Sequence, residues 1–124
     1  MLFRSKIVAC LGSTPEKSKA YAEKFSVART HPDLASLLAD KEVEAVYIAL
    51  PNAMHHEAVL AGAKAGKHML CEKPFAMKAD HAREMAAACK KAGVILRIAH
   101  QIRMDECVTK AREIVQSKIG RAHV

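Results

Sequence analysis

Short apolar runs alternate with helical patterns along this chain, and that alternation limits its fold more than any other feature. Each apolar run is long enough for one strand, and two of the runs stop at a proline, at Pro51 and at Pro74. Proline has no backbone N–H, so a strand ends at or before it. We expect strands at Ile7–Leu11, Ser26–Thr30, Val43–Leu50, His68–Cys71 and Val94–Ala99.

Five helical patterns accompany these strands, and turn residues mark their ends. Thr14 is a suitable N-cap before Pro15, while Gly66 and Gly93 suit left-handed helix ends. We expect helices over Pro15–Phe25, Pro32–Asp40, Met54–Ala65, Ala79–Ala92 and Asp105–Ser117. Their apolar stripes are Ala20, Tyr21 and Phe25; Leu34, Leu37 and Leu38; Val59, Leu60 and Ala63; Ala82, Met85, Ala86 and Cys89; and Val108, Ala111 and Val115. The alternation predicts an α/β fold, a doubly wound parallel sheet between two layers of helices.

Composition narrows the class of protein. The chain has 124 residues, enough for one domain, and a formal net charge of +7. Its Lys and Arg residues are scattered on polar helix faces without interleaved aromatic residues, so we expect no nucleic-acid partner. No apolar run approaches the ~20 residues that span a bilayer, and the N-terminus does not resemble a signal peptide. We therefore expect a cytoplasmic protein without a membrane partner. The four cysteines form no C-x-x-C pair, which favours reduced core thiols over disulfides or a metal site.

Two motifs carry a resemblance to a known family. The segment from Pro51 to His55 reads PNxxH, and the segment from Ala65 to Pro74 reads AGKHMLCEKP. Together they resemble the glucose–fructose oxidoreductase, inositol dehydrogenase and rhizopine-catabolism (Gfo/Idh/MocA) family, over about Lys6 to Gly120. The resemblance implies a Rossmann-like domain that binds NADP or NAD. It also implies hydride transfer between nicotinamide and a sugar, cyclitol or related polyol. We expect the intact protein to form a homo-oligomer.

The resemblance also implies that the chain is an internal fragment. A dinucleotide-binding fold normally begins with a strand and a G-x-G-x-x-G turn, and the five glycines here never form that pattern. Aligned with the family, residues 6–120 form part of the nucleotide-binding domain, without the first strand or the second domain. Residues 1–5 and 119–124 are either native or non-native ends. In a 3-2-1-4-5-6 sheet, Ile7–Leu11 and Ala45–Leu50 would then either pair directly or stay apart.

The first candidate group for cofactor binding follows the strand at Ile7–Leu11. A carboxylate often ends this strand and binds the ribose hydroxyls of NAD, but Gly12 stands here. Without that carboxylate a 2′-phosphate is not repelled, and Ser13, Thr14 and Lys17 can contact it, which favours NADP over NAD. The alternative is that Thr14 only caps the helix and Lys17 only faces solvent.

The second candidate group follows the strand that ends at Leu50. By resemblance, Leu50, Pro51 and Asn52 flank the cofactor, although family members often have Thr in place of Leu50. His55 matches a histidine of the family in this loop. Its role is either in the cofactor pocket or in helix capping and packing.

The third candidate group is Glu72-Lys73-Pro74, an acid, a base and a proline at the carboxyl end of a buried strand, where open α/β sheets place their ligands. A surface salt bridge beside a turn is the alternative. By resemblance this segment lies beside the nicotinamide, with Glu72 on the cofactor side and Lys73 facing substrate as the catalytic residue. A lysine there can bond a substrate hydroxyl and help remove its proton as hydride leaves carbon.

His100 and Arg103 follow the last strand at the same edge. By resemblance they line the substrate or brace a domain junction, and bracing alone is the alternative. Because a fold does not determine function, a non-catalytic nucleotide-binding or regulatory protein stays open beside the oxidoreductase.

Overall fold

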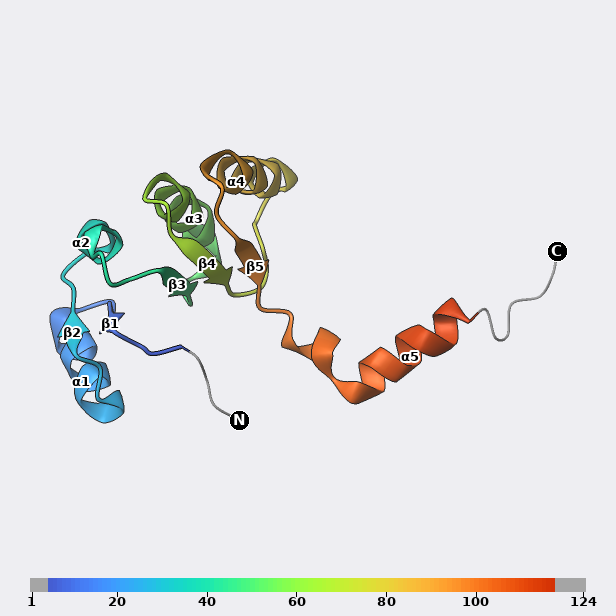
Figure 1. Cartoon of the computed structure of the whole chain (residues 1–124), viewed down its shortest axis with the longest axis horizontal. Coiled ribbons are helices and arrows are strands. Elements are labelled where there is room, and N and C mark those ends of the chain that lie inside the picture. The colour runs from blue at the N-terminus through green and yellow to red at the C-terminus, as the bar shows by residue number, and fades with distance from the viewer. Residues whose placement is uncertain (1–4, 118–124) are drawn as a thin grey trace.

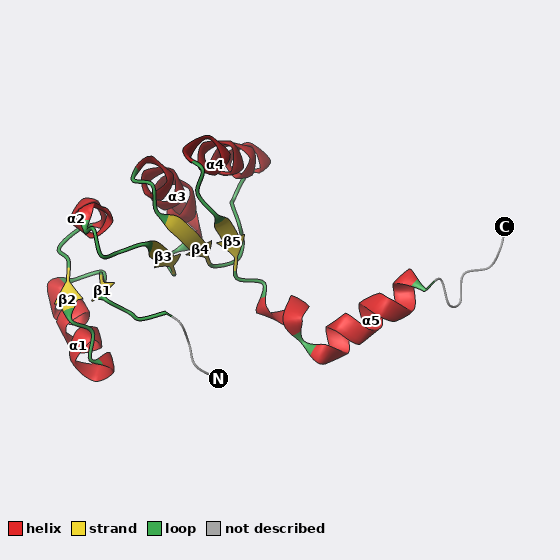
Figure 2. Cartoon of the chain, in the orientation of Figure 1, coloured by secondary structure: helices red, strands yellow, loops and turns green. Residues whose placement is uncertain are grey.

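The computed structural model describes residues 5–117, in which strands and helices alternate as the sequence predicts (Figures 1 and 2). In chain order the elements are β1 (Ala9–Cys10), α1 (Pro15–Phe25), β2 (Arg29–Thr30), α2 (Leu34–Ala39), β3 (Ala45–Ile48), α3 (His55–Lys64), β4 (His68–Cys71), α4 (Ala79–Ala92), β5 (Leu96–Ile98) and α5 (Glu106–Gln116). Two 3₁₀ turns follow β3 and β5, η1 (Asn52–Met54) and η2 (Gln101–Met104). The α/β class is confirmed, and the strands are shorter than expected.

The strands form two parallel sheets that remain apart. β1 pairs with β2, and β3, β4 and β5 pair in that order. No strand within residues 5–117 bridges β1 and β3. Of the two arrangements expected for these strands, separation is therefore the one observed. The order on each side agrees with an incomplete Rossmann-like sheet.

Capping residues act where the sequence predicts them. The Thr14 hydroxyl accepts a hydrogen bond from the Lys17 backbone N–H (3.3 Å), and Pro15 opens α1. Gly66 and Gly93 have φ angles of 71° and 69°, the left-handed values that glycine adopts at little steric cost. Each lies just after a helix and turns the chain toward the next strand.

The hydrophobic core lies between the β3–β4–β5 sheet and the helices α3 and α4 (Figure 2). Val59, Cys71 and Met85 are completely buried there. The opposite face of this sheet is open: Tyr47 on β3 pairs in register with Leu70 on β4, and both side chains are exposed. Among the described residues, helices cover only one face of this sheet. A complete three-layer sandwich is therefore not observed.

Helix α5 corrects one expectation. We expected Val108, Ala111 and Val115 to be buried, but α5 has no buried residue and projects away from the sheets (Figure 1). Val115 is 60% exposed. The helical spacing of the apolar residues is real, but it identifies a face that can be buried and not the surface that buries it.

The apolar residues expected along α1 are all exposed, Ala20 included, and one residue of the α4 stripe is exposed as well. Tyr21 and Phe25 are exposed and lie against each other, with ring centroids 4.6 Å apart. The buried residue of α1 is Ser18, which accepts a hydrogen bond from the Gly12 N–H (2.8 Å). On α4 the Ala86 side chain is exposed. Because α1 packs on only two short strands, they cover only the residues nearest them.

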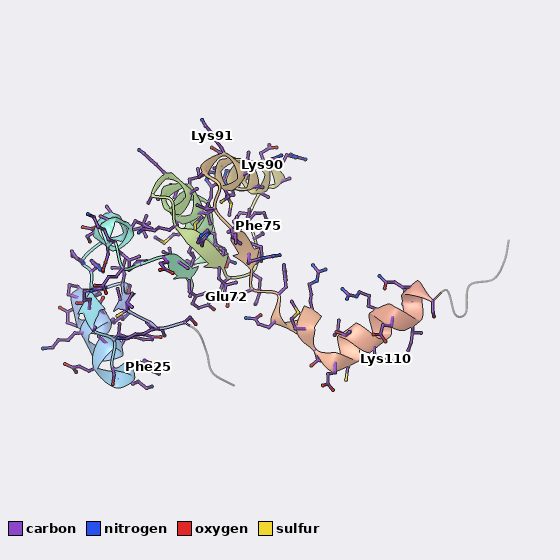
Figure 3. The ribbon with its side chains drawn as sticks, viewed as in Figure 1. Phe25, Glu72, Phe75, Lys90, Lys91 and Lys110 are labelled. Atoms are coloured by element: carbon purple, nitrogen blue, oxygen red, sulfur yellow. The ribbon has the colours of Figure 1, made fainter. Side chains whose placement is uncertain are left out.

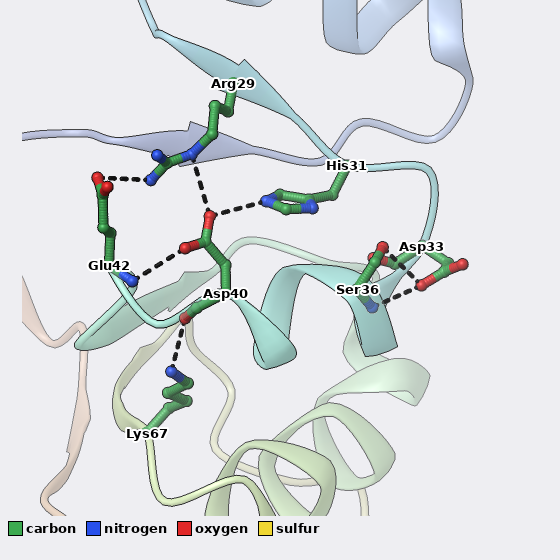
Figure 4. A network of polar contacts seen from close by, with 7 residues as sticks. All are labelled: Arg29, His31, Asp33, Ser36, Asp40, Glu42 and Lys67. Atoms are coloured by element: carbon green, nitrogen blue, oxygen red, sulfur yellow. Dashed lines mark hydrogen bonds and ion pairs between the residues drawn. The ribbon is translucent and has the colours of Figure 1, made fainter.

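A polar network connects β2 and α2 to the turn before β4 (Figure 4). Oδ2 of Asp40 lies 3.1 Å from Nε of Arg29 and 3.1 Å from Nε2 of His31. The Glu42 backbone N–H donates to the other oxygen, and it is the main reason that the pKa of Asp40 is lowered. Lys67 Nζ donates to the Asp40 backbone carbonyl (2.8 Å). Asp40 thereby links the β1–β2 sheet, through Arg29 and His31, to the segment that leads into β4, through Lys67.

Candidate functional site

Three of the predicted segments come together at one edge of the larger sheet. Ile48, Cys71 and Ile98 are neighbours across β3, β4 and β5, and each is the last residue of its strand. The strands are parallel, so the segments that follow them leave the sheet at the same edge. These segments contain Leu50, Pro51 and Asn52; Glu72, Lys73 and Pro74; and His100 and Arg103.

Glu72 is held by three hydrogen-bond donors. Oε1 accepts from the Tyr47 hydroxyl and from Nε2 of Gln101 (3.4 Å), and Oε2 accepts from the Lys73 backbone N–H (3.2 Å). The Tyr47 hydrogen bond is the main cause of a lowered pKa at Glu72, and the same bond raises the pKa of Tyr47. The carboxylate therefore stays ionised, and it joins the ends of the three strands (Figure 3 labels Glu72).

Tyr47 and Gln101 were absent from the candidates predicted from sequence. Alternation along β3 and β4 places Tyr47, Leu70 and Glu72 on the same face, and the register of the two strands brings them close. The period of two was readable from sequence, but the register was not. Gln101 directly follows His100, in a segment that sequence analysis did identify.

Lys73 does not pair with its neighbour Glu72. The Glu72 carboxylate is engaged by Tyr47, Gln101 and the main chain, and among the described residues the Lys73 side chain is exposed and has no hydrogen-bond or ion-pair partner. The surface salt bridge considered from the sequence is therefore not observed. The physical reason is that adjacent residues on extended backbone point to opposite sides. The Lys73–Pro74 peptide bond is cis.

His55 begins α3 and is completely buried. Its Nδ1 lies 3.0 Å from the Pro74 backbone oxygen, and its Nε2 lies 2.9 Å from the Leu50 backbone oxygen. The ring thus lies between the segments that follow β3 and β4. It does not open onto the exposed edge where Asn52 and Lys73 lie.

His56, the next residue, faces a different direction. Its Nε2 lies 2.8 Å from Oε2 of Glu84 on α4, and its ring stacks on His81 with centroids 4.0 Å apart. His56 therefore joins α3 to α4, as a packing residue would, and contacts neither loop through its ring.

Ser13, Thr14 and Lys17 form a second group at the carboxyl end of β1. Lys17 Nζ donates to the Ser13 hydroxyl (3.2 Å), and all three residues are exposed. A Cβ at Gly12 would lie 3.0 Å from the Ser18 backbone nitrogen, so a carboxylate side chain at Gly12 would require that helix start to shift. No hydrogen bond among the described residues joins this group to the one around Glu72.

His100 and Arg103 lie at the start of and within η2, and both are exposed. The Arg103 backbone N–H donates to the His100 carbonyl (3.0 Å), which closes the turn. The structure thus brings their backbones together at the edge near Glu72.

Metal ligation and other charged surfaces add little to this site. Among residues 5–117, no cluster of three or more His, Cys, Asp or Glu residues could hold a metal ion. All four cysteines are free thiols, and burial raises the pKa of Cys71 to about 11. Among residues 5–117, the helices are too short or too polar to cross a bilayer.

The labelled surface lysines do not gather in one place: Lys90 and Lys91 on α4 lie well away from Lys110 on α5 (Figure 3).

This arrangement defines a parallel α/β domain of the dinucleotide-binding class, with candidate residues at the carboxyl edge. Residues 2–100 match the Gfo/Idh/MocA oxidoreductase family, which is described by its NAD-binding Rossmann fold. The chain belongs to that family. The resemblance that the PNxxH and EKP segments suggested is therefore confirmed.

Known relatives show how much of such a protein the chain represents. It is 37% identical over 117 residues to 1,5-anhydro-D-fructose reductase of Ensifer adhaerens, covering 94% of this chain and 35% of that protein. It is 36% identical over 113 residues to D-xylose 1-dehydrogenase (NADP(+)) 2 of Haloferax volcanii, and the match covers 90% of this chain and 35% of that protein. The structure of levoglucosan dehydrogenase in complex with NADH and levoglucosan is similar, with a TM-score of 0.82 and 31% sequence identity. The match covers 91% of this chain and 31% of that one. The chain spans about a third of each of these relatives.

Proposed function

We propose that the chain is part of an NAD(P)-dependent oxidoreductase that transfers hydride between nicotinamide and a hydroxyl-bearing carbon of a sugar, cyclitol or related polyol. The observation that carries this proposal is the unpaired amine of Lys73 beside the fixed, ionised carboxylate of Glu72, at the carboxyl edge of the sheet. The names of the relatives support the substrate class, since they include D-xylose, 1,5-anhydro-D-fructose and levoglucosan.

The residues present suit a nicotinamide dinucleotide. Bound nicotinamide supplies the hydride acceptor or donor of the reaction. The segments Leu50–Asn52 and Glu72–Pro74 would flank the ring, because they leave neighbouring strands at the same edge. The Glu72 carboxylate accepts hydrogen bonds from Tyr47 and Gln101, which would hold its side chain in a fixed position on the cofactor side.

Lys73 would act on the substrate hydroxyl. In the oxidation, the C–H electron pair leaves as hydride and the hydroxyl proton must leave as well, so that a C=O bond forms. Because Tyr47, Gln101 and the main chain already bond the Glu72 carboxylate, the Lys73 ammonium is free to bond that oxygen and stabilise its developing negative charge, while the proton passes to solvent or to an acid–base residue of the second domain. His100 and Arg103 would line the substrate or a domain junction.

We extend the proposal to the cofactor preference, and favour NADP. Ser13, Thr14 and Lys17 offer two hydroxyls and an ammonium beside the N-terminus of α1, a suitable place for a phosphate. No carboxylate stands at Gly12 to bind ribose hydroxyls or repel that phosphate. Replacing Lys17 with Met in the complete protein should weaken NADPH binding about tenfold and leave NADH binding within about twofold. A tenfold loss corresponds to about 1.4 kcal/mol, near the lower end of what a charge-assisted hydrogen bond contributes, because the site is exposed. Equal losses for both cofactors would contradict the assignment.

We also propose that residues 6–120 belong to a nucleotide-binding domain whose partner domain supplies further acid–base residues, and that the complete protein is a homo-oligomer. The coverage of about a third of each relative supports this division. The gene on either side of this chain tests it. We expect a glycine-rich turn within ~30 residues upstream and a second domain downstream.

The activity is tested with the complete protein. It is incubated with NADP⁺ or NAD⁺ and a panel of sugars and cyclitols, and the formation of reduced nicotinamide is followed by absorbance. Cofactor binding is measured separately by fluorescence titration. Cofactor-dependent oxidation of at least one polyol is the expected result. A protein that binds the cofactor but oxidises or reduces none of the panel would be a binding or regulatory protein on this fold instead.

A further inference from the structure

His55 connects two loops from below the surface of the site. Its ring is completely buried, with Nδ1 3.0 Å from the Pro74 oxygen and Nε2 2.9 Å from the Leu50 oxygen. Leu50 lies two residues beyond β3, and Pro74 lies three residues beyond β4. The two carbonyls belong to segments that follow separate strands, and both contact this side chain.

The chemistry of the ring suits this position. A backbone carbonyl can only accept a hydrogen bond, so the ring donates to both oxygens only as the doubly protonated imidazolium, and either neutral tautomer donates to one of them. The ring nitrogens are the only polar atoms that the histidine side chain offers. They lie on opposite sides of a planar, rigid ring, so one side chain can reach both carbonyls at a fixed separation. A carboxamide carries both of its N–H groups on one nitrogen and has a flexible stem, so it cannot hold the two loops in the same way.

The two carbonyls adjoin the candidate site residues. The Leu50 carbonyl precedes Pro51 and Asn52, and the Pro74 carbonyl follows Glu72 and Lys73. Because the ring contacts both carbonyls, it helps to set the separation of the two segments, together with the main-chain hydrogen bond from the Glu72 N–H to the Ile48 carbonyl (2.9 Å). It also anchors them to the first turn of α3, which packs in the core.

We propose that His55 is a positioning residue that places Lys73 relative to the segment containing Asn52. We call the contact of the His55 ring with the Leu50 and Pro74 carbonyls the clamp. Its catalytic consequence rests on the proposed function, whereas the clamp itself does not. His55 was expected either in the cofactor pocket or in helix capping and packing. Complete burial with both nitrogens engaged assigns it neither a direct cofactor contact nor a filler role.

The test compares His55→Phe with His55→Gln in the complete protein, with His56→Phe as the matched control. Phenylalanine keeps a ring and removes both ring nitrogens, whereas glutamine keeps an N–H donor for one of the carbonyls. His56 is adjacent on the same helix but contacts Glu84 and His81. Each variant is measured by hydrogen–deuterium exchange, by NADPH titration and by steady-state kinetics.

The clamp predicts faster exchange at residues 72–77 and 50–54 in His55→Phe, with the α4 amides unchanged. Catalysis should fall about 10²-fold in kcat, the size of effect expected when a reacting group is displaced by about 1 Å. NADPH affinity should change much less than kcat, because the proposed 2′-phosphate contacts of Ser13, Thr14 and Lys17 lie outside the two segments that His55 joins. His55→Gln should protect one loop and recover part of kcat, and His56→Phe should resemble the wild type.

Two results would overturn the proposal. One is wild-type kcat and wild-type exchange in His55→Phe. The other is a general rise in exchange over the whole domain that His55→Gln shows equally, because that would reveal loss of packing alone. If His55→Phe does not fold, the exchange data of His55→Gln still test the clamp. Glutamine can bond only one of the two carbonyls, so the clamp predicts faster exchange in one loop than in the other. A wild type without polyol turnover would count against the proposed function, while the exchange data would still test the clamp.

Discussion

The Tyr47 hydroxyl donates a hydrogen bond to Oε1 of Glu72, and this contact joins β3 to the first residue after β4. It is the main cause of the lowered pKa of Glu72. The carboxylate therefore contributes stability at pH values above its unfolded pKa of about 4.3, and that contribution is lost as the pH falls through the lower folded value.

Replacing Tyr47 with Phe tests this contact. The pKa of Glu72 should rise toward its ordinary value, because its strongest donor is removed while those from Gln101 and Lys73 remain. The stabilising contribution of the ionised form should become smaller and should fade at a higher pH. The measurement is the ¹³C shift of the Glu72 carboxyl carbon against pH in both proteins. An unchanged titration midpoint would show that Tyr47 does not control this group.

A core substitution tests the packing of α4 on the sheet. Met85 is completely buried, whereas Met77 is 62% exposed just before α4. Met85→Ala should lower the free energy of unfolding of the domain by about 2–5 kcal/mol, since it removes buried surface and leaves a cavity. Met77→Ala should change it by less than about 0.5 kcal/mol. Urea unfolding of the complete protein, followed by circular dichroism, provides the comparison. Equal losses for the two methionines would mean that the α4 face is not arranged as described.

The isolated chain should be poorly behaved. Within residues 5–117, β1 and β3 are not paired with each other, the sheet face with Tyr47 and Leu70 is exposed, and the apolar residues of α5 are exposed. Unpaired strand edges and contiguous apolar surface favour association. We predict aggregation, or a partly molten state with strong dye binding and weak near-ultraviolet circular dichroism, and no tight cofactor binding. A soluble monomer with a sharp cooperative melt and micromolar NADPH affinity would contradict this.

Local signals predicted the elements well. Thr14, Pro15, Gly66 and Gly93 act on their immediate neighbours, and the structure places a helix start or a helix end at each. The alternation of strands and helices implied the parallel order for a similar reason, because chain connectivity restricts the possible topologies.

The remaining features depend on long-range packing. The apolar spacing of α5 and the exposed rings of Tyr21 and Phe25 could not be assigned a partner from sequence. The same holds inside the site. Leu50 and Pro74 meet at His55, and Tyr47 meets Glu72, only because two strands pair in one particular register. A change of one residue in register would place Tyr47 on the opposite face from Glu72.

Steady-state kinetics of Lys73→Met in the complete protein test the central claim most directly. Methionine keeps much of the apolar stem but removes the ammonium, and the Lys73 side chain makes no described contact whose loss would unfold the domain. We predict that kcat falls about 10²–10⁴-fold while cofactor affinity stays nearly unchanged. A variant with normal turnover would make Lys73 a structural residue of the turn, and the catalytic assignment would be wrong.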